Sequence, residues 1–167
     1  MDSTELSIKF NVGDVVVYPT EGVGIVECLE IRREREYLKI KLSGSDMDVL
    51  LPADNASVLG LRLTASAKEV KEALLSLSKT NGTISSDWKT RFQENQALLK
   101  DGRVSSVAMI VNNLYRRSKI KELPALERKL YDTAISMLVD ESSYVLGIDK
   151  EDMRKEIFLK LENLQDK

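Results

Sequence analysis

Trp88 stands out among the side chains that could bind another molecule, because it is the one tryptophan and cations flank it. Ser85 or Ser86 can cap a helix, which places Trp88 in its first turn beside Lys89 and Arg91. A flat apolar ring can enter the minor groove of DNA at a distorted base step while neighbouring cations hold the phosphates. The alternative is a core position packed against Phe92, one turn on. The sequence leaves both interpretations open.

A second group of cations lies further along the chain: Arg116, Arg117, Lys119, Lys121, Arg128 and Lys129. Contacts from such side chains to phosphate oxygens position a protein on a duplex without reading its sequence. We therefore interpret the group as a phosphate-contacting strip, with a solvated loop as the alternative. The cations expected to reach phosphates first are Lys89, Arg91, Arg128 and Lys129.

The residue types that most covalent chemistry needs are missing. The sequence has no histidine and one cysteine, Cys28, which excludes serine–histidine and cysteine–histidine nucleophiles and an ordinary zinc site. It also lacks a Walker A loop and a G-x-G-x-x-G motif. We expect a protein that is not an enzyme, with no catalytic residues, no cofactor and no metal. Cys28 lies in an apolar run and is predicted to be a small buried hydrophobe.

The net charge of −2 hides an uneven distribution. Residues 1–60 carry −5, residues 61–130 carry +7 and residues 131–167 carry −4. A basic segment between two acidic ones suits a protein with one surface for nucleic acid and another for protein. A solvated helical face would give the same pattern, so charge alone does not decide.

The elements that must position these residues fall into two groups. Over residues 8–60, β-branched and alternating runs bounded by turn residues predict four or five short strands: Val15–Tyr18, Ile25–Ile31, Glu36–Leu42 and Met47–Pro52. So many strands in so few residues imply a small, strongly bent antiparallel barrel. The charged run from Ile31 to Glu36 is interpreted as a hairpin tip, or as an exposed strand edge open to another protein's sheet.

From Thr64 onward the apolar period becomes helical. Ser66 and Glu69 form a capping box before a first helix that ends at Asn81-Gly82, and Pro124 fits the first position of a fourth. A last helix is predicted over roughly residues 150–164. No apolar run approaches the about 18 residues that a membrane helix needs, and the N-terminus is acidic. We expect no membrane contact and a cytoplasmic location.

Several motifs resemble one family. The opening run Phe10–Pro19 with Gly22-Val23-Gly24, and the later run Leu51–Ala56, resemble the polymerase-interacting domain of CarD/CdnL regulators, a module also found in transcription-repair coupling factors. The resemblance continues through Asp87–Asn95, Leu114–Arg117 and Leu123–Leu130, which are similar to the family's helical domain. It covers roughly residues 8–145, and the tryptophan helix favours the free-standing regulator.

The resemblance implies an α+β fold with two domains. Residues 1–62 would form a Tudor/SH3-like antiparallel β-barrel that binds the β subunit of RNA polymerase. Residues 63–167 would form an all-helical domain of about five helices that contacts DNA at the upstream edge of the melted region. The protein would be a monomer that stabilises the promoter open complex and binds promoter DNA weakly, without sequence preference.

The resemblance also assigns DNA-contacting positions. The family's wedge tryptophan falls on Trp88, and basic DNA-contacting positions fall near Arg91 and on Arg128. A lysine of the family falls on Gln93, which is neutral, so this position lacks the family's charge.

On the barrel, a polymerase-contacting arginine falls on Arg32, with Arg33 beside it. A second polymerase-contacting arginine of the family falls on Leu50, so an apolar side chain stands here in place of a cation. The competing hypothesis is a protein–protein adaptor with a Tudor-like barrel, a buried Trp88 and no direct DNA contact.

Overall fold

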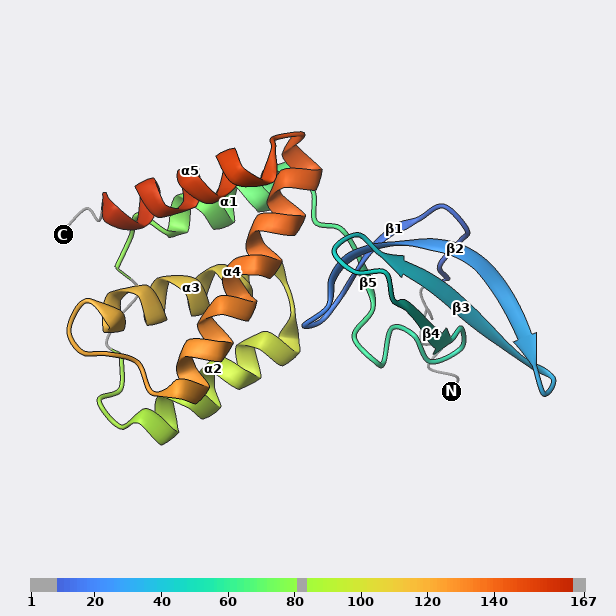
Figure 1. Cartoon of the computed structure of the whole chain (residues 1–167), viewed down its shortest axis with the longest axis horizontal. Coiled ribbons are helices and arrows are strands. Elements are labelled where there is room, and N and C mark those ends of the chain that lie inside the picture. Colours follow the sequence, from blue (N-terminus) through green and yellow to red (C-terminus); the bar gives the residue numbers. More distant parts are fainter. Residues whose placement is uncertain (1–8, 81–83, 164–167) are drawn as a thin grey trace, which may run out of the picture. The chain divides into compact units, whose positions relative to one another are not determined.

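The computed structural model describes residues 9–80 and 84–163 and divides the chain into two compact units, Met1–Thr64 and Ala65–Lys167. Within the described residues the first unit holds the strands and the second holds the helices (Figure 1). The predicted α+β class, with an N-terminal antiparallel β domain and a helical C-terminal domain, is therefore confirmed.

The first unit is one antiparallel sheet in the order β4-β3-β2-β1-β5. Its strands are β1 (Val15–Tyr18), β2 (Gly22–Arg32), β3 (Arg35–Leu42), β4 (Asp48–Pro52) and β5 (Arg62–Leu63). From Leu38 to Leu42 every second residue of β3 is buried, as the alternation of the sequence predicts. The core of this unit gathers Phe10, Val16, Val26, Leu38, Ile40, Leu42, Leu51, Ala56 and Leu61.

A bulge in β2 explains one wrong prediction. The register between β2 and β3 shifts between Val26 and Cys28, so that Val26 lies opposite Ile40 but Cys28 lies opposite Lys39. A bulge turns the following residue to the other face of the sheet. Cys28 is consequently half-buried instead of a core residue.

The charged run after β2 is a hairpin tip. Arg32 pairs with Arg35 across the ladder, which leaves Arg33 and Glu34 as the two loop residues. Both have positive φ, 50° and 62°, as the central residues of a type I′ turn must. The hairpin-tip interpretation therefore holds, and the turn lacks the glycine or asparagine that such a turn favours.

The second unit holds five described helices, and α3 contacts three of the others, α1, α2 and α4. The helices are α1 (Ala67–Ser76), α2 (Trp88–Asp101), α3 (Val104–Ser118), α4 (Ala125–Leu146) and α5 (Lys150–Glu162). One large aliphatic core joins them, with residues such as Leu77, Ile110, Leu114, Leu138, Met153 and Ile157 almost fully buried. None of the described helices has the length and apolarity to cross a bilayer.

Capping signals in the sequence predict most of the helix starts to within a residue or two. The capping box at Ser66 and Glu69 is present, whereas Pro124 is the N-cap of α4 instead of its first helical residue. The predicted end of the first helix at Asn81-Gly82, like residue 164 of the last helix, lies outside the described residues.

Candidate nucleic-acid interface

The start of α2 presents Trp88 to solvent. Asp87 caps the helix: its carboxylate accepts hydrogen bonds from the Thr90 backbone N–H at 3.4 Å and from the Thr90 hydroxyl at 2.7 Å. The hydroxyl bond is the main reason that the pKa of Asp87 lies below its usual value. Trp88 is then the first helical residue and 40% of it is exposed. The ring is therefore available to a partner, and the structure does not place it in the core.

Arg91 has a different place from the one that the sequence suggested. It is 3% exposed, and its Nε and Nη2 donate to the two carboxylate oxygens of Glu127 at 2.6 and 2.8 Å. Its Nη1 donates to the Ser85 carbonyl oxygen at 2.9 Å. Because these partners occupy the guanidinium inside the unit, the prediction that Arg91 contacts DNA is wrong.

The Arg91–Glu127 pair instead joins two helix starts. Glu127 is fully buried in the first turn of α4, and Arg91 lies one turn into α2. Figure 1 shows α2 and α4 beginning side by side, as this contact requires. Removing one partner of such a pair costs about 3–5 kcal/mol, because the other charge stays buried without compensation. The pair therefore fixes the place of Trp88 relative to the start of α4.

Three predicted cations remain on the surface at this end of the unit. Lys89, Arg128 and Lys129 are exposed, in the first turns of α2 and α4. Arg128 makes one ion pair, at 3.8 Å to Asp132, in which both side chains are more than 60% exposed. Such surface pairs contribute about 0–1 kcal/mol, so Arg128 can exchange this partner for a phosphate. The positive ends of two helix dipoles add to the attraction for anions.

Two residues at this end of the unit are not assigned to the site by the sequence. Glu127, whose pairing with Arg91 organises the site, looked like one more surface carboxylate of a charged run. Leu126 is 54% exposed in the first turn of α4 and adds apolar surface at the same end as Trp88. The apolar period of α4 would assign Leu126 to the core. Only the way in which α2 and α4 cross shows that Leu126 is exposed.

The residues assigned to polymerase lie in two places on the sheet. Arg32 ends β2 and Arg33 is in the turn, both exposed, with Arg32 bonded to Glu30 at 3.0 Å. Leu50 is half-buried in β4, the outer strand beyond β3, directly across the ladder from Lys39. Lys39 lies four residues along β3 from Arg35, which is about 13 Å at the usual rise of a strand. The hairpin tip and the outer strand are thus separate parts of one surface.

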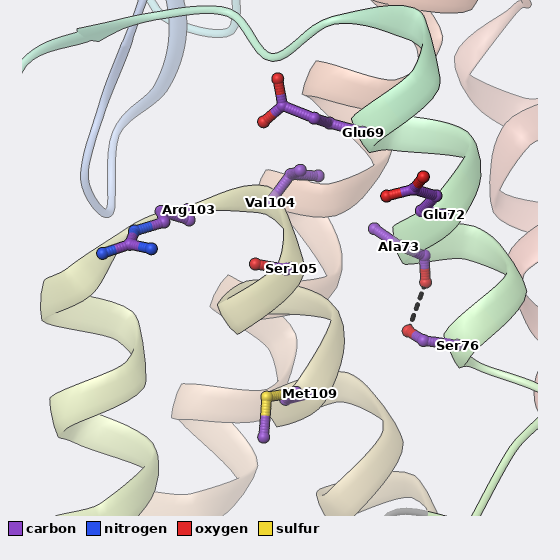
Figure 2. Close-up of a pocket in the computed structure, with 8 residues that line it drawn as sticks. All are labelled: Glu69, Glu72, Ala73, Ser76, Arg103, Val104, Ser105 and Met109. Carbon is purple, nitrogen blue, oxygen red and sulfur yellow. Dashed lines mark hydrogen bonds between the residues drawn. The ribbon is translucent and has the colours of Figure 1, made fainter.

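A pocket of about 470 Å³ lies elsewhere, between α1 and the start of α3. Figure 2 shows the carboxylates of Glu69 and Glu72 on one wall and Arg103, Ser105 and Met109 on the other. Glu69 belongs to the capping box of α1 and Arg103 pairs with Asp101 at 3.4 Å. None of the predicted site residues lines this pocket, so the candidate site is an exposed surface.

Two family models match the two units of this chain. The model described as "CarD, C-terminal domain" matches residues 72–158, which is more than half of the sequence, and the model described as "CarD-like/TRCF RID domain" matches residues 10–63. The chain belongs to the CarD family. The resemblance seen in the motifs is thereby confirmed, and the family is one of transcription factors that carry an RNA polymerase-interacting domain.

A curated relative agrees with this assignment. The "Putative transcription factor YdeB" of Bacillus subtilis (strain 168) is 28% identical over 149 residues, covering 87% of this chain and 97% of the relative. The alignment therefore spans the CarD polymerase-interacting unit and the helical unit together.

Proposed function

We propose that this CarD family member binds the β subunit of RNA polymerase through its sheet and stabilises the promoter open complex through its helical unit. The observation that carries the proposal is the half-exposed Trp88, which begins a helix at the end of the unit where Lys89, Arg128 and Lys129 are exposed. The protein acts as a monomer, without cofactor or chemistry.

Trp88 acts as a wedge in this mechanism. Its ring enters the minor groove at the upstream edge of the melted DNA, where the base steps are already distorted. Lys89, Arg128 and Lys129 hold phosphates beside it, while the buried Arg91–Glu127 pair keeps the two helix starts in register. The ring binds distorted DNA better than closed duplex, and only such differential affinity can shift the equilibrium toward the open complex.

The sheet supplies the second half of the mechanism. Arg32 and Arg33 at the hairpin tip make charged rim contacts with polymerase, and the half-buried Leu50 contributes apolar surface on the outer strand β4. An outer strand can pair with a strand of another protein. Docking in this way raises the local concentration of the helical unit, so weak DNA binding without sequence preference is sufficient.

The test is the lifetime of the open complex on a promoter with polymerase and the full chain. Trp88→Ala should leave the melting temperature nearly unchanged and remove most of the stabilisation, since loss of a stacked ring costs about 1–3 kcal/mol, or about 5- to 150-fold. Leu75→Ala is the matched control, because Leu75 is also a large exposed side chain, on α1. An unchanged lifetime with Trp88→Ala would favour the adaptor hypothesis.

A further inference from the structure

A second basic surface lies where the end of α3 meets α5. The Lys119 Nζ is 5.0 Å from the centroid of the Tyr115 ring, and the Arg154 Cζ is 5.5 Å from the centroid of the Phe158 ring. The two rings contact each other edge to face, with centroids 6.3 Å apart. Two cations from distant parts of the sequence are therefore held over one pair of adjoining rings.

These cations differ from others on the helical unit in what neutralises them. Exposed cations such as Arg128, Lys155 and Lys150 have carboxylate partners. Lys119 and Arg154 are exposed and make no ion pair with any residue in the described ranges 9–80 and 84–163. An aromatic face attracts a cation but carries no net charge. Within the described residues, no carboxylate therefore neutralises Lys119 or Arg154.

The hydroxyl of Tyr131 lies within electrostatic range of both basic surfaces. Tyr131, on α4, has a pKa raised to about 12, chiefly by burial and also by the nearby Tyr115. Arg128 and Arg154 both act on the same hydroxyl in the opposite direction, so both cations lie near it. Arg128, at the start of α4, and Arg154, on α5, therefore both act on the same buried side chain.

We propose that Lys119 and Arg154 bind the phosphate backbone of the same duplex that Trp88 engages, extending the DNA contact from the starts of α2 and α4 onto α5. This proposal rests on the proposed function of the Trp88 end. The rings themselves offer little contact area, because Tyr115 is buried and Phe158 half-buried, whereas Ile120 and Leu159 beside them are exposed. The argument for phosphate is therefore the pair of cations that have no carboxylate partner among the described residues. A guanidinium packed on a ring also presents its edge to a phosphate in a fixed orientation.

The test is fluorescence anisotropy of the full chain with a labelled duplex over a salt series. Each lost phosphate contact lowers the slope of log affinity against log salt by about 0.9. The double variant Lys119→Ala/Arg154→Ala should therefore reduce the slope by about 1.8 and weaken all duplex sequences alike. The double variant Lys119→Gln/Arg154→Gln keeps more of the packing over the rings and should give the same change, so a folding defect of the alanine variant would not hide the result.

The matched control is Lys68→Ala/Lys71→Ala, which removes the same charge from the exposed face of α1. Lys71 lines a different cleft, with Lys160, and its loss should leave the slope nearly unchanged. A slope that is unaltered in both Lys119/Arg154 variants while Arg128→Ala still lowers it would overturn this inference and leave the proposed function standing. Unaltered DNA binding together with weaker capture by polymerase would also overturn it, because the surface would then serve a protein.

Discussion

The buried Arg91–Glu127 pair allows a quantitative prediction from geometry alone. Glu127→Gln preserves the shape of the side chain but leaves the Arg91 guanidinium, 3% exposed, without a counter-charge. The wild-type pair has two short charge-assisted bonds, 2.6 and 2.8 Å. Losing the carboxylate should lower the free energy of unfolding by about 3–5 kcal/mol. For a helical unit of this size each kcal/mol is worth about 4–8 °C, so the melting temperature should fall by at least about 12 °C.

The control is the double variant Arg91→Met/Glu127→Leu. Replacing both partners by apolar side chains removes both buried charges, and such exchanges are neutral or stabilising in comparable cases. Thermal and urea unfolding followed by circular dichroism would measure both variants at low and high salt. The loss in Glu127→Gln should persist at high salt, since a buried pair is screened little. A loss below about 1 kcal/mol, or a double variant as unstable as the single one, would refute the role of the pair as the link between α2 and α4.

Three further predictions concern charge. Arg32→Glu should weaken capture of the chain by an isolated β-subunit lobe, because it replaces an exposed rim cation with a carboxylate beside Glu30. DNA binding should stay unchanged. Undiminished capture would place the polymerase interface elsewhere. In the same anisotropy assay, Arg128→Ala should lower the salt slope by about one unit for every duplex sequence, and an unchanged slope would remove Arg128 from the interface. The lowered pKa of Asp87 means that its cap stabilises α2 at neutral pH and that this contribution is lost as the pH falls through the folded-state pKa, which lies below the usual value for an aspartate. Trp88 fluorescence should report that transition, and a curve identical in Asp87→Asn would show that the cap does not cause it.

Much of the fold could be predicted from the sequence because its signals are local. The alternation in β3 and the capping box at Ser66 depend on neighbours within a few residues, and both are present in the structure. The bulge that moves Cys28 off the core face carries no such signal, because it depends on the partner strand. Trp88 could be assigned to a helix start, but its exposure depends on which face of α2 the other helices cover.

The candidate site was predicted in part for the same reason. Lys89, Arg128 and Lys129 are exposed cations near a helix start, as the sequence suggests. In the sequence Arg91 resembles one more surface cation beside them. In the structure it is buried, because it pairs with Glu127, far along the chain, when α2 and α4 pack. Local charge patterns cannot reveal a pair of this kind. The sequence around Arg91 therefore does not distinguish an internal salt bridge from a cation that contacts DNA.

The central claim is that Trp88 distinguishes distorted DNA from closed duplex. The most direct measurement compares the affinity of the full chain for a fully paired duplex and for a matched duplex with a pre-melted segment, with wild type and Trp88→Ala. Wild type should prefer the pre-melted DNA by about 5- to 150-fold, and the variant should lose most of this preference while keeping its salt slope. Equal affinity of the wild type for both DNAs, or a preference that survives in Trp88→Ala, would contradict this claim.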